Sequence, residues 1–196
     1  MIDMPSSATQ PKLSARDRLL ASADELFYQE GVHSVGIDRV IEHAGVAKAS
    51  LYNSFGSKEE LVHAYLLGRQ ATTTARVTAA IEAQDNPRDQ VLAVFDSQAE
   101  SQRRPGFRGC AFAAASAESK PGGLVEDATR GYRDWFRALF TRLATEAGAQ
   151  HPEILGRQLQ LLYDGAASSG NLDHDASAAT TARAAAEILL DASLDA

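Results

Sequence analysis

The stretch that decides the fold runs from Gly36 to Phe55 and reads GIDRVIEHAGVAKASLYNSF. Its first half, Ile37–Ala44, places apolar residues at helical spacing, and Gly45 then supplies a residue that tolerates the positive φ of a helix end. Its second half, Lys48–Phe55, predicts a helix of about two turns that ends before Gly56. Two short helices joined by a glycine turn predict a helix-turn-helix motif.

The helix predicted over Lys48–Phe55 has an apolar and a polar side. Leu51 and Phe55 are four residues apart and are expected to point inward. The side chains expected to face outward can all form hydrogen bonds: Lys48, Ser50, Tyr52, Asn53 and Ser54. The major groove of DNA admits a helix, in which Lys donates to guanine and Asn pairs with adenine, and hydroxyl groups bind phosphates and bases. This pattern therefore predicts DNA recognition.

Helical periodicity continues along the rest of the chain, and alternating strand patterns are nearly absent. Ser14 and Ser57 are each followed three residues later by an acidic residue, which is typical of helix starts. We predict an all-α protein of about nine helices. Their expected ranges are Ser14–Glu30, Ile37–Ala44, Lys48–Phe55, Ser57–Ala83, Asp89–Gln102, Cys110–Glu118, Leu124–Ala147, Pro152–Ser169 and Ala176–Ala192.

The whole-chain composition is that of an ordinary globular protein, with 196 residues, 44% of them hydrophobic, and a net charge of −7. Its single cysteine, Cys110, excludes an internal disulfide and a cysteine-cluster metal site, and favours a reducing compartment. The opening residues MIDMPSSATQPK lack the apolar centre of a signal peptide. No apolar run approaches the roughly 20 residues of a membrane span. We expect a cytoplasmic protein without a membrane partner.

Charge around the predicted motif is not basic overall. From Leu13 to Thr72 six Lys or Arg face eight Asp or Glu, a net charge of −2, although no acid occurs from His43 to Lys58. A single copy would therefore make few phosphate contacts and bind DNA modestly. Two copies double those contacts, so a homodimer is close to a requirement of the DNA-binding interpretation.

Motifs of catalysis are absent from the sequence. There is no Gly-x-Ser-x-Gly turn, phosphate-cradling P-loop or Gly-x-Gly-x-x-Gly, and no two of the five histidines have the spacing of a helical metal pair. We predict no catalytic residue, no cofactor and no metal. Cys110 is interpreted as a small core residue, with a redox role as the alternative. Asp173-His174-Asp175 is interpreted as a solvated loop rather than a cation site.

The segment from Ala15 to Leu67, about a quarter of the chain, resembles the N-terminal domain of TetR/AcrR-type regulators. The matching runs are LFYQEGV (26–32), SVGIDRVIEHAGVAKASLYNSF (34–55) and GSKEELV (56–62). The resemblance implies a symmetric dimer whose third helix enters the major groove. It assigns DNA contacts to Lys48, Ser50, Tyr52, Asn53, Ser54 and, at the start of the fourth helix, Lys58. Gly36 and Ala47 stand where family members often have hydroxyls, and Ser54 where His is frequent, so capping at the first two positions must come from the backbone.

Three parts follow from this resemblance and from composition: a disordered arm (1–12), a DNA-binding domain (13–72, helix-turn-helix about 36–55) and a helical bundle for ligand binding and dimerisation (73–196). Candidates for lining an inducer pocket are Phe95, Phe107, Cys110, Phe112, Trp135, Phe136 and Tyr163. The alternative is that these side chains only fill the core, because a pocket also needs convergent polar groups. Gln98, Arg103 and Asn171 are candidates for such groups.

Two stripes predict a dimer interface of four helices. One is apolar and contains Leu155, Leu159, Leu162 and Tyr163; the other has mostly small residues, Ala178, Ala182, Ala185, Ala186 and Leu189. The alternative is that both stripes pack inside one chain. The sequence thus predicts a repressor of a palindromic operator in double-stranded DNA that a small-molecule inducer releases. The alternatives are a constitutive DNA-binding protein, and an all-α enzyme or interaction module.

Overall fold

The computed structural model describes residues 13–194, and every regular element in this range is an α-helix. The all-α prediction is confirmed, while the predicted disordered arm, residues 1–12, lies outside the described residues. The nine helices of the described part are α1 (Ala15–Glu30), α2 (Ile37–Ala44), α3 (Lys48–Phe55), α4 (Lys58–Glu82), α5 (Pro87–Gln102), α6 (Ala111–Glu118), α7 (Leu124–Glu146), α8 (Pro152–Leu172) and α9 (Ala178–Leu194).

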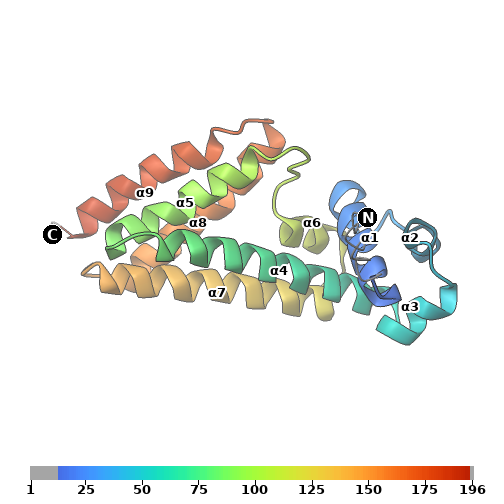
Figure 1. Ribbon diagram of the computed structural model, residues 1–196. Coiled ribbons are helices and arrows are strands. Elements are labelled where there is room, and N and C mark those ends of the chain that lie inside the picture. Colours follow the sequence, from blue (N-terminus) through green and yellow to red (C-terminus); the bar gives the residue numbers. More distant parts are fainter. Residues whose placement is uncertain (1–12, 195–196) are drawn as a thin grey trace, which may run out of the picture.

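Two parts of unequal size share the long helix α4 (Figure 1). Helices α1, α2 and α3 gather around the start of α4, and α5, α7, α8 and α9 form a bundle along its remainder. The short helix α6 lies between α1 and the bundle. The domain boundary expected at residue 72 falls inside α4, which continues unbroken to Glu82. A displacement of α4 or α6 therefore reaches both parts.

Helix starts follow side-chain caps that the sequence contains. Ser14 and Ser57 each accept a hydrogen bond of 3.1 Å from the N–H three residues further on. Helix α5 begins two residues before the predicted start, because Asn86 accepts from the N–H of Asp89 at 2.9 Å and Pro87 occupies the first turn. Local capping chemistry therefore sets these helix starts.

Helix α8 runs past its predicted end at Ser169, because Gly170 is a packing position rather than a helix stop. A Cβ atom at Gly170 would lie 3.0 Å from the amide of Gln102. The buried Gln102 side chain donates to the carbonyl of Ala166 (2.8 Å) and accepts from the N–H of Ala179 (3.1 Å). One amide thus joins α5 to both α8 and α9.

The core of the bundle is built around aromatic rings. Phe136 of α7 packs against Tyr163 of α8 with ring centroids 4.4 Å apart, and Phe95 of α5 packs against Phe140 at 5.8 Å. Such pairs contribute about 0.5–1.5 kcal/mol beyond the area that they bury. Burial of these rings fixes the positions of α5, α7 and α8 around the interior.

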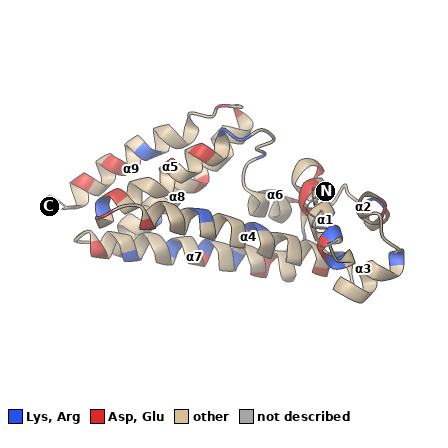
Figure 2. Cartoon of the chain, viewed as in Figure 1, with Lys and Arg blue, Asp and Glu red and all other residues tan. Residues whose placement is uncertain are grey.

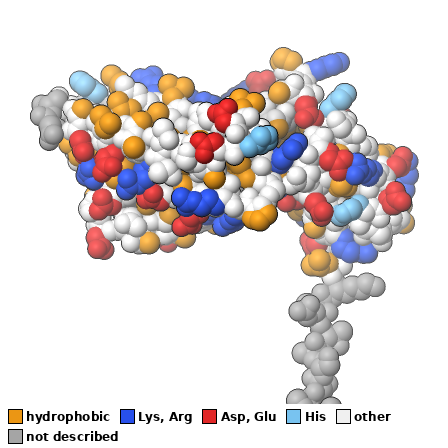
Figure 3. All heavy atoms as spheres, turned by 90° about the horizontal axis from the view of Figure 1, so that it is seen from above, with side chains coloured by type: hydrophobic (Ala, Val, Ile, Leu, Met, Phe, Trp, Pro, Cys, Tyr) orange, Lys and Arg blue, Asp and Glu red, His pale blue; other side chains and the backbone are white. Residues whose placement is uncertain are grey.

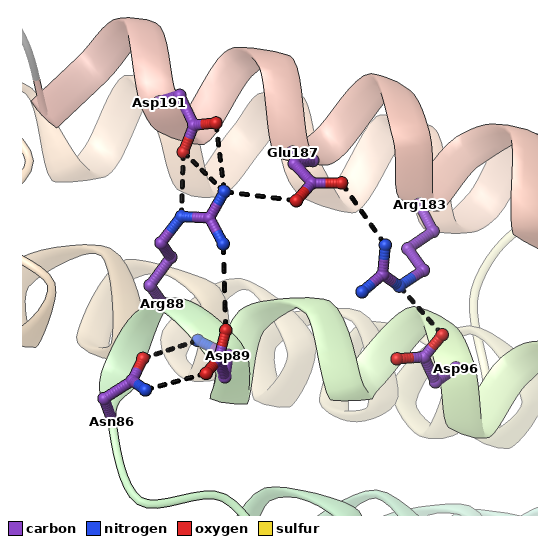
Figure 4. A network of polar contacts seen from close by, with 7 residues as sticks. All are labelled: Asn86, Arg88, Asp89, Asp96, Arg183, Glu187 and Asp191. Atoms are coloured by element: carbon purple, nitrogen blue, oxygen red, sulfur yellow. Dashed lines mark hydrogen bonds and ion pairs between the residues drawn. The ribbon is translucent and has the colours of Figure 1, made fainter.

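On the surface of the bundle, an ion-pair network connects α5 with α9 (Figure 4). Arg88 donates to Asp191 at 2.8 Å and to Glu187 at 3.1 Å, and Arg183 pairs with Asp96 at 2.8 Å. These side chains are one third or more exposed, so each pair contributes only about 0–1 kcal/mol. The network orients α9, while buried contacts provide most of its stabilisation.

Candidate nucleic-acid interface and cavity

The turn between α2 and α3 depends on one glycine and one arginine. Gly45 has φ 60° and ψ 44°, the left-handed conformation that glycine adopts without steric cost. From α1, Arg18 Nη1 donates to the carbonyls of Ala44 (3.3 Å) and Gly45 (3.1 Å), which satisfies the end of α2. Neither Gly36 nor Ala47 contributes a side-chain cap. The sequence interpretation missed Arg18, because its partners lie 26 and 27 residues away.

Helix α3 is held on the domain by its apolar side and leaves its polar side open. Leu51 is 0% and Phe55 9% exposed, and the Arg16 guanidinium lies 5.0 Å from the Phe55 ring centroid. Tyr52 is 46% exposed. Lys48 and Asn53 are exposed as well, whereas Ser50 and Ser54 are half-buried. The structure therefore places three of the five candidate DNA contacts of α3 in the open.

The two lysines of the candidate interface already have partners. Helix α3 carries no acidic residue (Figure 2), but Lys48 Nζ lies 2.9 Å from Asp38 Oδ1 of α2, and this hydrogen bond raises the pKa of Lys48. Lys58 is half-buried, and its Nζ donates to the carbonyl of His33 at 3.4 Å. A DNA phosphate would compete with a carboxylate for Lys48 and with a carbonyl for Lys58.

A cavity of about 100 Å³ lies where α1, α4, α5, α6, α7 and α8 converge. Four of the pocket candidates line it: Phe107, Cys110, Phe112 and Tyr163. Gln98 also lines it, whereas Arg103 and Asn171 do not. The sequence interpretation missed further wall residues, among them Tyr28, Arg69, Arg76 and Tyr132. No local pattern could have found them, because they come from three different helices.

Three pocket candidates do not line this cavity, and for Phe95 and Phe136, which fill the core, this corrects the expectation. Phe95 and Phe136 are 0% and 1% exposed and pack against Phe140 in the aromatic core. Trp135 lines a separate hollow with Ile81 and Leu139, between α4 and α7. Rings at helical spacing do not reveal which of them face a cavity and which fill the core.

Burial keeps the tyrosine hydroxyls and the cysteine thiol of the cavity wall neutral. It raises the pKa of the Tyr163 hydroxyl and places that of Tyr132 well above its ordinary value. It also raises the pKa of the Cys110 thiol. Because the thiolate is the reactive form, this environment gives Cys110 the character of a wall residue rather than a redox sensor.

Tyr28 of α1 lines the cavity and hydrogen-bonds to the segment before α6. The Tyr28 hydroxyl donates to the carbonyl of Gly109 (3.0 Å) and accepts from the N–H of Arg108 (2.9 Å). The Arg69 guanidinium of α4 lies 3.8 Å from the centroid of the Tyr28 ring and pairs with Asp24 of α1 at 2.6 Å. One wall residue thus connects α1, α4 and the segment before α6.

Helix α6 makes a second connection to the helix-turn-helix part. Glu118, its last residue, accepts from the N–H of His33 at 2.6 Å. Gly31 has φ 96°, which favours glycine, and a Cβ atom there would lie 2.5 Å from Glu118 Oε1, so a side chain at this position would displace the carboxylate. In the preceding segment, Gly106 accepts from the Gln29 side chain at 3.1 Å. Helix α6 and the segment before it therefore form a bonded bridge to α1.

Five of the nine residues in the two predicted stripes are buried inside the chain: Leu155, Leu159, Tyr163, Ala182 and Ala186. Leu155, Leu159 and Ala182 are 1%, 0% and 7% exposed, so their side chains cannot present an interface, which corrects that expectation. The remaining members are half-buried: Leu162, Ala178, Ala185 and Leu189. The apolar side chains that α8 and α9 expose lie at neighbouring positions, Ile154, Leu161, Leu172 and Ile188, which are 50–73% exposed. In Figure 3 hydrophobic side chains are conspicuous on the left half of the visible face, which the bundle forms.

Within residues 13–194, no group of three or more His, Cys, Asp or Glu is arranged to hold a metal ion. No helix in that range has the length and hydropathy that spanning a membrane requires. The fold thus contains a helix-turn-helix with an exposed polar face and a helical bundle with a cavity. Hydrogen bonds connect the wall of this cavity to α1. These features define an all-helical helix-turn-helix regulator.

The comparisons identify the family. The family model described as "Bacterial regulatory proteins, tetR family" matches residues 19–65. The structure is similar to that of SCO4454, a TetR-family transcriptional regulator from Streptomyces coelicolor, with a TM-score of 0.87 and 40% identity, covering 91% of this chain and 95% of that one. The chain belongs to the TetR family of transcriptional regulators.

Curated relatives match over shorter stretches. The HTH-type transcriptional activator FasR of Mycolicibacterium smegmatis is 32% identical over 87 residues, which is 44% of this chain and 40% of FasR. The HTH-type transcriptional repressor NemR of Escherichia coli is 33% identical over 81 residues, 41% of each chain. The matched part thus spans less than half the length of these relatives. They are transcription regulators and not enzymes, in agreement with the non-enzymatic prediction.

Proposed function

We propose that this chain is a homodimeric repressor that binds a palindromic operator and leaves it when a small molecule enters the cavity. The observation that carries the proposal is the open polar face of α3, held in place by the buried Leu51 and Phe55. Side chains that donate and accept hydrogen bonds suit base edges and phosphates. The proposed contacts are Lys48, Ser50, Tyr52, Asn53, Ser54 and, at the start of α4, Lys58.

Two copies would associate through α8 and α9. The exposed Leu161, Leu172 and Ile188 favour this surface, because contact between two copies would remove them from water. The two copies of α3 would then lie about one turn of DNA apart, roughly 34 Å. Doubling the phosphate contacts compensates for the net charge of −2 in residues 13–72.

Ligand response would travel through the bridge to α1. A molecule that enlarges the cavity pushes on Tyr28, on the segment containing Gly109 and on α4, which all reach the helix-turn-helix part. The ligand changes DNA affinity only to the extent that it prefers the conformation that does not bind DNA. A coupling free energy of about 1–3 kcal/mol corresponds to a change of roughly 5- to 150-fold.

Repression is the proposed sign of regulation, although the curated relatives include both an activator and a repressor. A dimer covering DNA excludes other proteins by occupancy alone, whereas activation needs a further surface for a partner. The second candidate is a constitutive DNA-binding protein without an effector. The cavity and its hydrogen bonds to α1 favour the effector-responsive alternative.

The test is to sequence the genomic fragments that co-purify with the protein and to measure mobility shifts on the enriched fragment. We expect a dimer to shift DNA containing an inverted repeat, with an affinity that falls steeply with salt. A reporter placed behind that fragment should be expressed more strongly when the gene for this chain is deleted. A monomer in solution, or no enriched fragment at low salt, would overturn the proposal.

A further inference from the structure

We propose that the cavity binds a small organic anion that also carries a hydrogen-bond donor, namely a hydroxy- or amino-substituted carboxylate no larger than one six-membered ring. This inference rests on the proposed function, since it takes the cavity to be the effector site. It follows from three features of the wall: an uncompensated positive charge, a buried acceptor without a partner, and aromatic surfaces around a small volume.

The positive charge belongs to Arg76 of α4. Its guanidinium donates to the backbone carbonyl and the hydroxyl of Ser97, which are both neutral. The other charged wall residues have partners of opposite sign: Arg69 pairs with Asp24, and Asp164 pairs with Arg133, each at 2.6 Å. Among the ion pairs of residues 13–194 none includes Arg76. The wall therefore keeps one positive charge that an anion would neutralise.

No other wall group supplies the missing negative charge. Burial raises the pKa of Tyr163 and of the Cys110 thiol, so both are protonated near neutral pH. Burial raises the pKa of the Tyr163 hydroxyl more than the positive charge of the neighbouring Arg76 lowers it. A neutral phenol beside a guanidinium can donate a second hydrogen bond to the same carboxylate.

The unpartnered acceptor is Gln98 Oε1. The Gln98 side chain is 4% exposed, and its Nε2 donates to the carbonyl of Tyr163 at 2.8 Å. That bond sets the orientation of the amide and leaves Oε1 buried without a hydrogen-bond partner. Because Gln98 lines the cavity and an unpaired buried acceptor is costly, a ligand O–H or N–H is favoured here.

Size and shape restrict the ligand further. The volume of about 100 Å³ is well below the roughly 300–1,000 Å³ of sites for larger molecules. Phe112 of α6 and Tyr132 of α7, both in the wall, stack with centroids 4.0 Å apart, and Phe107 adds another ring. Such surfaces suit a single planar ring with a carboxylate and a hydroxyl at its edge.

Isothermal titration calorimetry of the purified full-length protein tests this with three probes: 4-hydroxybenzoate, its neutral counterpart 4-hydroxybenzamide, and benzoate, which lacks the hydroxyl. We expect 4-hydroxybenzoate to bind at least about tenfold more tightly than either of the others, because each lacks one interaction with a charged or buried group. Equal affinities, or no binding of 4-hydroxybenzoate at millimolar concentration, would overturn the proposal. This comparison on the unaltered protein depends on no variant.

Variants then assign the preference to residues. Arg76→Gln should remove the preference for the acid over the amide, and Gln98→Met the preference for the hydroxyl. Arg130→Gln, which alters an exposed arginine of α7, should change neither. Thermal unfolding verifies that each variant is folded. If the folded Arg76→Gln variant still binds 4-hydroxybenzoate more tightly than 4-hydroxybenzamide, Arg76 does not recognise the carboxylate.

Mobility shifts without any probe keep the two proposals separate. If the protein shifts DNA but binds none of the three probes, this inference fails while the DNA-binding function stands. If 4-hydroxybenzoate binds as expected and no DNA is shifted, the proposed function fails while the ligand class stands.

Discussion

The face of α3 and the wall of the cavity use polar side chains in opposite ways. On α3, Tyr52 and Asn53 are exposed, so their polar atoms can form hydrogen bonds with solvent in the absence of DNA. In the cavity, Gln98 and Tyr163 are buried, so each of their polar atoms needs a partner of defined geometry. Substitutions in the two regions should therefore differ in their effects. Substitution on the exposed face should leave the stability of the free protein unchanged. Substitution in the buried wall should change both ligand binding and stability.

Truncating one core side chain in each part has the largest expected effect. Phe136→Ala should lower the free energy of unfolding by about 3–5 kcal/mol and Leu51→Ala by about 2–5 kcal/mol, because both side chains are almost completely buried. Circular dichroism during thermal unfolding measures both. Leu51→Ala should also abolish the mobility shift, since α3 loses its attachment; retained DNA affinity would mean that α3 is not the reading helix.

Alkaline titration sharpens the buried side of the contrast. Burial raises the pKa of Tyr132 and Tyr163 above the ordinary value of 10.0, so the folded state holds these protons more tightly than the unfolded state. The resulting stabilisation is complete below pH 10 and is lost as the pH rises through the folded-state values. Denaturant unfolding at increasing pH should show this loss, with a smaller slope for Tyr163→Phe. Identical slopes would contradict the assignment.

Substitution on the open face should affect DNA binding alone. Tyr52→Ala is expected to lower DNA affinity by about 1–3 kcal/mol while changing the free energy of unfolding by less than about 0.5 kcal/mol. Leu67→Ala is the matched control, because Leu67 of α4 is also 46% exposed. Mobility shift and thermal unfolding of both variants decide. Early unfolding of Tyr52→Ala would show that Tyr52 belongs to the core.

The smallest effect is expected at the α5–α9 ion pairs. Arg88→Ala should cost at most about 1 kcal/mol of stability, and the difference from the unaltered protein should shrink in high salt, because the side chains are exposed. Denaturant unfolding at two salt concentrations measures this. A loss of several kcal/mol that persists in high salt would mean that the network behaves as a buried one.

The helices of the motif could be predicted residue by residue because their signals are local. Ile37–Ala44 and Lys48–Phe55 are α2 and α3 as observed, bounded by Gly45 and Gly56. Apolar spacing and glycine conformation act within a few residues, so no tertiary information is needed. The same reasoning separated Leu51 from Tyr52 on α3.

The cavity and the dimer surface could not be predicted in this way. Tyr28 and Arg69 reach the cavity from the segment assigned to DNA binding, and only the folded chain brings them to Cys110. Helix α8 is apolar on two sides, and the sequence does not say which side α7 and α9 cover. Leu159 proved to be inside and Leu161 outside.

The bridge at Gly31 and Glu118 bears on how this regulator can be rebuilt. Grafting residues 13–72 onto the bundle of another regulator would keep α3 but lose Glu118, whose carboxylate accepts a hydrogen bond from the His33 N–H. Under the proposed function, such a chimera keeps its DNA recognition but responds poorly to the new effector. An engineered biosensor should therefore include α6 and the segment before it together with the helix-turn-helix part.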